Sequence, residues 1–370
     1  MKIRKPDYYD RFQCIAGACR DSCCIGWEID VDEERQEAYQ TVTGEIGERL
    51  KKCIDWEEGH FILQGKEERC PFLNKDNLCD LIIELGEESL CDICREHPRF
   101  YEWYDAFTEV GVGLCCEAAA ALVLEKEEKV CFVECEDPDN EEQSEENTED
   151  AEVVQVLMNA RETAFAILQD RKQSVWSRLK LFLTYVEELQ DALEFGSLDE
   201  IEESTAYYRN ASYEMEDETV QDTIAAYEVI LDYCEKLEPI DESWPARLEK
   251  LRDKLADAEI FCETEEKMQA EMQGRDYEYE HLAVYFVYRY FMKCRTDGDV
   301  YARGCLTVFC IMLIRLLDIV TYLENGSLSK EDRVQNAKNC SKEIEYSEDN
   351  LALLAELFWN EGFETIAGGL

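Results

Sequence analysis

The sequence predicts a mainly α-helical protein, with a cysteine-rich N-terminal metal-binding domain that contains a small β-hairpin, followed by an all-helical C-terminal domain. Three observations predict it. Thirteen of the 19 cysteines lie in the first 135 residues. Residues 134–152 carry eleven acidic residues and no basic one, a composition that cannot form a packed core. Beyond them, apolar residues recur at helical spacing. We therefore expect a metal-binding domain at 1–133, an acidic linker at 134–152 and a helical domain at 153–370.

The N-terminal domain is predicted to contain few regular elements. Residues 30–53 indicate a helix, and residues 69–80 indicate two short strands around a Lys-Asp-Asn turn. Residues 114–128, rich in Ala and Leu, indicate a second helix. This arrangement places most of the cysteines on turns and at helix starts, where backbone N–H groups stabilise thiolate charge.

The C-terminal domain is predicted to be helical from the spacing of its apolar residues at 153–158, 179–193, 219–237 and 244–261. Two further segments, 277–294 and 300–323, are aromatic-rich or apolar on most faces and are predicted to form its buried centre. The longest apolar stretch, Cys305–Ile314, is followed by Arg315 and Asp318. It is shorter than the ~18 to 20 residues that span a bilayer, so we expect a buried helix and no membrane partner.

The charge of the chain restricts its partners. Its formal charge is -48 at pH 7, from 86 acidic and 38 basic residues. A field of this sign repels phosphate backbones, which argues against nucleic acid and favours cationic partners. The first ten residues are not followed by an apolar segment, so no secretory signal is predicted and we expect a cytoplasmic protein. In a reducing compartment, 19 cysteines favour a metal site over a disulfide framework.

The cysteines that indicate metal chemistry lie in four segments: 14–24, 70–79, 91–99 and 113–117. Soft thiolates bind iron–sulfur clusters or zinc, and all-sulfur ligation fits both. A zinc ribbon needs two separate C-x2-C pairs, and outside the double cysteines only Cys91 and Cys94 form one. The C-x3-C-x2-C motif of radical enzymes is absent as well. Three cysteines outside the dense segments are expected to be ordinary structural thiols: Cys53, Cys131 and Cys135.

The order of these motifs carries a resemblance to a known family. It runs Phe12-x-Cys14, Cys19, Cys23-Cys24-x2-Trp27, Cys70-Pro-Phe-Leu, Leu-Cys79, Cys94-Arg-x2-Pro-Arg99 and Cys116-Glu-x-Ala. This pattern resembles the flagellin lysine N-methylase family, which is similar to a broader class of cysteine-cluster proteins that chelate zinc or iron. The resemblance covers about the first 125 residues well, and the helical region more faintly.

The resemblance implies a metal centre, two cofactors and a substrate. The matching metal ligands are Cys14, Cys19, Cys23, Cys24, Cys70, Cys79, Cys94 and Cys116. The cofactors are an iron–sulfur cluster, of the 4Fe-4S type or replaced by zinc, and S-adenosylmethionine. The substrate is a flagellin-like protein that presents a lysine. Eight cysteines exceed the four ligands of one cubane cluster, so either two centres exist, or one centre and additional structural or redox thiols.

Catalysis by such a protein requires that the lysine lose its proton, because its pKa is ordinarily near 10.4. The candidate groups for this role are Glu117, Tyr8, Tyr9, Tyr101 and Tyr104. No Gly-rich strand-to-helix fingerprint is present, so the methyl donor is expected to bind in another way.

Three residues that follow Cys94 in the sequence have two possible roles. Arg95, His97 and Arg99 either donate hydrogen bonds to cluster sulfurs or hold their loop through carboxylate pairs, and His97 is also a candidate ligand. His60 and His281 are expected to be ordinary partners in the fold.

The leading hypothesis is an S-adenosylmethionine-dependent protein-lysine N-methyltransferase with an iron–sulfur centre. One alternative is a non-enzymatic zinc- or iron-binding protein, in which the metal only folds the N-terminal domain and the helices bind a partner. Another is a redox protein or cluster carrier.

Overall fold

The computed structural model describes residues 2–104, 106–136, 148–212 and 220–370. Most of the chain is helical, as the sequence predicts. Most buried apolar residues belong to one of two separate cores. The smaller, which we call the second core, is built from residues 29–91, and the larger, the main core, contains most of the other buried apolar side chains.

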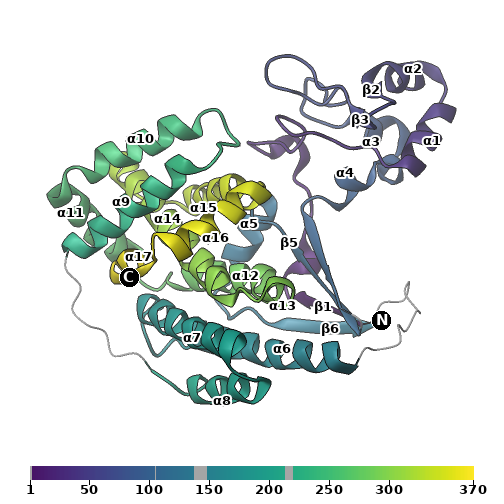
Figure 1. Cartoon of the computed structure of the whole chain (residues 1–370). Helices are drawn as coiled ribbons and strands as arrows, with labels where there is room; N and C mark the ends of the chain where they lie inside the picture. The colour runs from purple at the N-terminus through teal and green to yellow at the C-terminus, as the bar shows by residue number, and fades with distance from the viewer. Residues whose placement is uncertain (1, 105, 137–147, 213–219) are drawn as a thin grey trace.

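The second core is enclosed by short elements. They are α1 (Glu33–Thr41), α2 (Gly44–Cys53), the hairpin strands β2 (Ile54–Asp55) and β3 (His60–Phe61), α3 (Asp80–Leu85) and α4 (Asp92–Glu96). Phe61 and Phe72 lie at its centre, with ring centroids 5.1 Å apart. Figure 1 shows these elements grouped together beside the helical body.

A four-stranded sheet joins the N-terminal segment to the main core. Its order is β4 (Arg99–Trp103), β5 (Phe107–Val112), β1 (Lys2–Pro6) and β6 (Phe132–Glu136). Strand β1 runs parallel to β5 and antiparallel to β6. The buried carboxylate of Glu109 on β5 accepts hydrogen bonds from Arg4 and Arg161, which ties the sheet to the helices. Helix α5 (Glu117–Glu125) packs in the same core.

The helical body is assembled around α14 (Val300–Asn325), which contacts α7, α9, α11, α12, α15 and α16 (Figure 1). Its other helices are α6 (Thr148–Leu168), α7 (Val175–Phe195), α8 (Leu198–Tyr208), α9 (Val220–Lys236), α10 (Trp244–Leu255), α11 (Ala258–Glu271), α12 (Tyr277–Tyr290), α13 (Cys294–Asp297), α15 (Lys330–Glu345), α16 (Glu348–Asn360) and α17 (Glu364–Gly368). Among the described residues, α14 is the one helix long and apolar enough to cross a membrane, and 83% of its apolar window is buried inside the protein.

Two predicted helices are each divided in two. The segment at 30–53 breaks between Thr41 and Gly44, because Gly44 adopts a positive φ of 83° that ends helical continuity. The segment at 244–261 breaks where Asp257 caps α11 by accepting a hydrogen bond from the Ile260 amide. The predicted helix at 114–128 is shorter and starts after Cys116.

The predicted strands at 69–80 are wrong. Leu73 and Cys79 form a single bridge, and the side-chain oxygen of Asn74 accepts hydrogen bonds from the amides of Asp76 and Leu78. Asn74 therefore closes a tight turn, and α3 begins directly after it. The hairpin is instead formed by β2 and β3, and the four-stranded sheet was not predicted.

The acidic linker predicted at 134–152 falls mostly on residues 137–147, which lie outside the described residues. Its ends belong to regular elements, since residues 134–136 are in β6 and residues 148–152 are in α6. The hydrophobic packing crosses this predicted linker. The sheet and α5, which lie in the predicted N-terminal domain, share the main core with the helices.

A buried carboxylate in the helical body makes stability depend on pH. Glu280 accepts hydrogen bonds from Arg171 and from Arg178 at 2.7 Å. Burial alone would raise the pKa of Glu280, but the two guanidinium groups outweigh it and hold the pKa below its usual value of 4.5. Glu280 thus stabilises the fold above that pH, and its contribution is lost as the pH falls through the lowered pKa.

We expect Glu280→Gln to lower the free energy of unfolding by about 3 to 5 kcal/mol at pH 7, because Arg178 is left buried with an uncompensated charge. Urea denaturation at pH 7 and at pH 3 measures this loss, which should shrink at pH 3. Glu263→Gln, in an exposed pair with Lys267, is the control and should cost less than about 0.5 kcal/mol. An equal loss for Glu280→Gln at both pH values would contradict the expectation.

Candidate cysteine centre

The segment of residues 14–27, which carries four of the predicted metal ligands, is anchored to both cores. On one side, the Cys70 amide donates to the Cys24 carbonyl at 2.8 Å, and the Gly26 amide donates to the Glu68 carbonyl. On the other side, the backbone amide and the Nε of Arg20 each donate to the Glu117 carboxylate on α5 at 2.9 Å. The segment therefore lies at the junction between the second core and the helical body.

Helix α15 holds the same segment through two lysines. Lys338, whose side chain is buried, pairs with Asp21, and Lys342 lies 3.7 Å from the same carboxylate. Further along, the rings of Trp27 and Tyr346 meet edge to face at 5.2 Å. These anchors join residues more than 300 positions apart in the chain, so no local sequence signal indicates them.

Three thiols occupy helix starts, the kind of position expected for most of the cysteines, although the helices after Cys79 and Cys91 were not predicted. Cys79, Cys91 and Cys116 are the N-cap residues of α3, α4 and α5. Burial raises the pKa of Cys79 and of Cys116, while the backbone N–H groups of the first helical turn act in the opposite direction. Such N–H groups stabilise the thiolate form that binds a metal.

Four of the predicted ligands gather around the start of α5, and we call them the α5 thiol set: Cys14, Cys19, Cys23 and Cys116. The Cys19 thiol donates to the Glu117 carboxylate at 3.8 Å, directly beside Cys116. The hydrogen bond to Cys24 and burial raise the pKa of Cys23, and the charges of Cys14 and Cys116 raise it further. The hydrogen bonds between Arg20 and Glu117 bring the segment that carries Cys14, Cys19 and Cys23 to the start of α5.

The other four predicted ligands border the second core, and we call them the second-core thiol set: Cys24, Cys70, Cys79 and Cys94. Cys70 is a buried member of that core, and the other three pack against it. Burial raises the pKa of Cys70, and the charges of Cys24 and Cys79 add to the shift. Cys94 is likewise a charge neighbour of Cys24 and Cys70.

Two cysteines off the family pattern lie close to these sets. Cys91 is fully buried in the second core, and its thiol shares a hydrogen bond with that of Cys94, which lowers the pKa of Cys91. Cys115 is buried, and its thiol shares a hydrogen bond with Tyr346. The C-x2-C spacing is the signal that could have placed Cys91 with the ligands.

The donor chemistry of the eight cysteines suits a soft metal, and several of their thiols face backbone N–H groups. Among the described residues, no group of three or more His, Cys, Asp or Glu side chains is arranged to hold a single metal ion. The assignment of these cysteines as ligands therefore stays a prediction.

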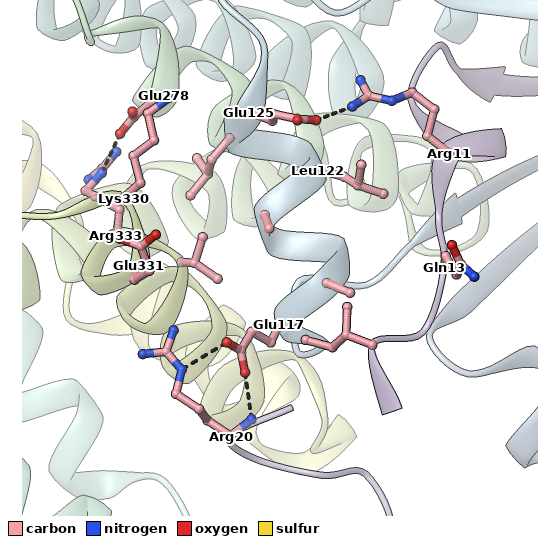
Figure 2. A pocket seen from close by; sticks show the side chains of 15 residues that line it. Arg11, Gln13, Arg20, Glu117, Leu122, Glu125, Glu278, Lys330, Glu331 and Arg333 are labelled. Atoms are coloured by element: carbon pink, nitrogen blue, oxygen red, sulfur yellow. Dashed lines mark hydrogen bonds and ion pairs between the residues drawn. The ribbon is translucent and has the colours of Figure 1, made fainter. Parts of the chain in front are cut away.

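A cavity of about 420 Å³ lies directly beside the α5 thiol set. Figure 2 shows Arg20 and Glu117 together on one side of it and the Arg11–Glu125 pair on another. Its wall on the helical body contains Lys330, Glu331 and Arg333 of α15, among the side chains drawn in Figure 2. The cavity thus presents both signs of charge close to Cys19 and Cys116.

Glu117 is the one predicted catalytic candidate that lines this cavity. Burial alone would raise its pKa, but the hydrogen bonds and charge of Arg20 hold the pKa of Glu117 below its usual value. Glu117 is therefore an ionised carboxylate, which attracts a cation strongly and accepts a proton weakly.

The four candidate tyrosines lie elsewhere. Tyr8 is buried in the main core, where burial raises its pKa. Tyr9 packs against that core, with the Lys5 ammonium over its ring. Tyr101 donates a hydrogen bond to Glu96 at 2.6 Å, and Tyr104 lies against Glu109. None of them lines the cavity beside Cys19.

The residues after Cys94 make contacts within their own loop. Arg95 pairs with Asp92 and Glu96, and the guanidinium of Arg99 donates to the Arg95 carbonyl at 3.2 Å. Burial lowers the pKa of His97 to about 4, so its ring is neutral at pH 7. Of the other two histidines, His60 lies 3.6 Å from Glu28, and buried His281 contacts the Val123 carbonyl at 3.0 Å.

The fold and the site together define a mainly helical protein whose thiols gather at helix starts, beside a charged cavity. The chain belongs to the family described as FliB lysine N-methylase C-terminal domain, whose model matches residues 161–370. The family predicted from the cysteine pattern is thereby confirmed, and the match lies on the helical region, where the resemblance was fainter.

Curated relatives agree with this family. The chain is 29% identical over 133 residues to a lysine-N-methylase of Salmonella typhimurium, which is 34% of this chain and 33% of the relative. It is 27% identical over 133 residues to the flagellar biosynthetic protein FliU of Salmonella muenchen, covering 34% of this chain and 78% of that protein. The match spans about a third of the lysine-N-methylase. No solved structure matches the chain.

Proposed function

We propose that the protein methylates lysine side chains of a flagellin-like protein, with S-adenosylmethionine as the methyl donor and an iron–sulfur centre on the family cysteines. The observation that carries this proposal is the position of the cysteine-bearing segment 14–24, which Arg20 holds against Glu117 at the edge of a cavity that both residues line. The family membership supports the lysine substrate, and the relative named flagellar biosynthetic protein FliU supports a flagellar one.

The cavity suits two cationic reactants. The donor's sulfonium and the acceptor's ammonium are both attracted by the carboxylates of Glu117, Glu125 and Glu331. The donor also carries a carboxylate, for which Arg11, Arg20 and Lys330 provide positive charge in the same cavity. An iron–sulfur centre, which the pattern cysteines would hold, would supply a soft, electron-accepting group.

The role of Glu117 follows from its low pKa. Because Arg20 keeps the carboxylate ionised, Glu117 holds the lysine ammonium or the sulfonium in place rather than removing a proton. Arg20 in turn fixes Cys19 next to Glu117, so substrate binding and thiol position are linked through one ion pair.

The test is an anaerobic purification of the full chain, with measurement of iron, sulfide and zinc, followed by incubation with flagellin and methyl-labelled S-adenosylmethionine. We expect label on lysine in the iron-loaded protein and none after iron is removed. Zinc without label would favour the non-enzymatic binding protein. A labile, reducible centre without label would favour the redox protein or cluster carrier, and either outcome contradicts the proposal.

A second prediction concerns the cavity carboxylate. Glu117→Gln keeps the shape of the side chain but removes the charge, and we expect kcat/KM for lysine methylation to fall at least about tenfold, equivalent to about 1.4 kcal/mol of binding energy. Glu263→Gln is the control, because Glu263 lies outside the cavity in an exposed pair with Lys267 and should leave kcat/KM unchanged. Wild-type kcat/KM in Glu117→Gln, at unchanged iron content, would rule out the role assigned to this residue.

A further inference from the structure

We infer that an extended segment of the protein substrate docks on the outer edge of β4 and adds a strand to the four-stranded sheet; the identity of this partner rests on the proposed function. Strand β4 lies at one end of the order β4-β5-β1-β6, so one of its edges has no strand beside it among the described residues. An edge of this kind presents backbone N–H and C=O groups with which another extended chain can pair.

The hydrogen bonds between β4 and β5 fix which backbone groups of β4 point outward. At one end of the ladder the Gly113 amide donates to the Pro98 carbonyl at 2.7 Å, and at the other end the Tyr104 amide donates to the Phe107 carbonyl at 2.9 Å. Hydrogen-bonded pairs alternate with non-hydrogen-bonded pairs in an antiparallel ladder, so the even-numbered residues of β4 bond to β5. The odd-numbered residues therefore direct their N–H and C=O groups outward: Arg99, Tyr101 and Trp103. None of the three makes another backbone hydrogen bond to a described residue.

The outward positions of β4 carry exposed aromatic surface. The rings of Tyr101 and Trp103 stack on one another, with centroids 5.8 Å apart and 16° between their planes. Trp103 is 67% exposed, although tryptophan is highly buried on average in folded proteins. Residues two apart in a strand point to the same face, so the two rings form one platform beside the open backbone groups. Exposed Trp and Tyr side chains of this kind contribute much of the binding energy at protein interfaces.

The opposite edge of the sheet, on β6, is protected by charge. Beside the ladder between β6 and β1, the Asp7 amide donates to the Cys131 carbonyl at 2.8 Å. By the same alternation, the residues of β6 whose backbone groups point outward are Phe132, Glu134 and Glu136. Two of these three carry a carboxylate, and charged side chains on an edge discourage the addition of a strand. Of the two edges, β4 is therefore the one that is open to a further strand.

The charge of the chain favours a lysine-bearing peptide over a second copy of the chain as the occupant of this edge. The formal charge of -48 at pH 7 makes two copies repel one another and disfavours any acidic partner. A lysine-bearing segment is attracted by the same field, and its ammonium is stabilised over an exposed indole ring such as that of Trp103. The occupant is therefore an extended segment of another protein that carries lysine and few acidic residues.

The N-terminal end of β4 lies next to the cavity that Glu117 lines. The Arg99 guanidinium lies 5.3 Å from the centre of the Phe12 ring. The residues on either side of Phe12, Arg11 and Gln13, line the cavity and lie on the same side of it in Figure 2. An extended chain rises about 3.3 Å per residue, so a segment paired along the five residues of β4 brings its next residues toward this wall. We expect the acceptor lysine just beyond the paired residues, where its ammonium approaches Glu117.

The experiment measures the binding of peptides to the full chain by fluorescence anisotropy, with overlapping synthetic peptides that cover a flagellin sequence as the probes. Tyr101→Ala and Tyr101→Pro both remove the ring, but only proline also removes the outward N–H donor. Proline is tolerated on an edge strand where this N–H faces solvent. We expect Tyr101→Pro to bind the best peptide at least about tenfold more weakly than Tyr101→Ala does. Glu134→Pro, the equivalent change on β6, is the matched control and should bind as the wild type does.

Methylation of the peptide's own backbone nitrogens gives a test that leaves the protein unchanged, and it decides where Tyr101→Pro fails to fold. A chain added to a strand bonds to it through every second residue, so an N-methyl group should weaken binding at least about tenfold at alternate positions and little at the positions between them. An effect without this period of two, or no binding of any peptide, would overturn the inference. A concentration-dependent dimer of the wild type that Tyr101→Pro disrupts would overturn it as well, because a second copy would then occupy the edge.

Methyl transfer to flagellin is measured with the same variants. Peptide binding with a period of two, but without label on lysine, would keep the docking edge and contradict the proposed function. Label on lysine with the same kcat/KM in Tyr101→Pro, Trp103→Ala and the wild type would do the reverse.

Discussion

Replacing Cys70 with serine is expected to unfold the second core while the helical body stays intact. This core contains only twelve buried apolar residues, of which two are cysteines. An assembly of this size is marginal on hydrophobic burial alone, and if the proposed metal is bound there, its binding would be part of the folding free energy. Hydrogen exchange should accelerate at least about a hundredfold across residues 29–94, equivalent to ~2.7 kcal/mol or more, with α7, α12 and α14 unchanged.

The control separates metal loss from a simple packing defect. Cys53 packs against the same core but lies outside the predicted ligand sets, so Cys53→Ser should leave the exchange of residues 29–94 nearly unchanged. Wild-type protein treated with a chelator should reproduce the Cys70→Ser pattern. If the chelator leaves the protection of these residues intact, metal does not fold the second core and the expectation fails.

The second large effect is expected at a buried ion network in the helical body. Arg333 donates to Glu278 at 2.8 Å and pairs with Asp318, and its guanidinium lies over the Tyr279 ring. Asp318 also accepts hydrogen bonds from Tyr279 at 2.9 Å and from Asn336 at 2.8 Å. Arg333→Met leaves buried Asp318 without its cation, whereas Glu278 keeps its pair with Arg275, and the change should lower the free energy of unfolding by about 3 to 5 kcal/mol.

Urea denaturation of a double-mutant cycle checks this value. Asp318→Asn removes one of the two carboxylates, so Arg333→Met should cost less in that background than in the wild type. Arg252→Met is the control, because Arg252 forms exposed pairs with Asp232 and Glu235 and should cost less than about 1 kcal/mol. Fully additive effects of Arg333→Met and Asp318→Asn would show that the pair is not coupled.

The helices could be predicted from sequence because their apolar spacing is a local signal. The segment 179–193 lies within α7, and the segment 300–323 lies within α14. The helix breaks at Gly44 and Asp257 were not predicted, because one glycine or one capping side chain ends a helix without changing the apolar pattern around it. The four-stranded sheet was not predicted, because β1 pairs with strands more than 100 residues away in the sequence.

The candidate site was predictable in its residue types but not in its grouping. The motif order indicates the eight cysteines, and the helix at 114–128 indicated a helix near Cys116, whereas the helix start at Cys79 was predicted as a strand. Which core Cys70 and Cys116 pack against is a property of the tertiary structure. The ion pair between Asp21 and Lys338 joins residues 317 positions apart, so no local sequence signal indicates it.

The position of β1 has a consequence for the order in which the nascent chain folds. Residues 2–6 form an inner strand, whose two neighbours lie at 107–112 and 132–136, and the Tyr288 hydroxyl donates to the Arg4 carbonyl. During synthesis β1 cannot pair with these strands until they have left the ribosome, whereas residues 29–94 leave the ribosome before them. The segment between β1 and β4, which contains the second core, can therefore fold and bind its ligand before the sheet and the helical body assemble.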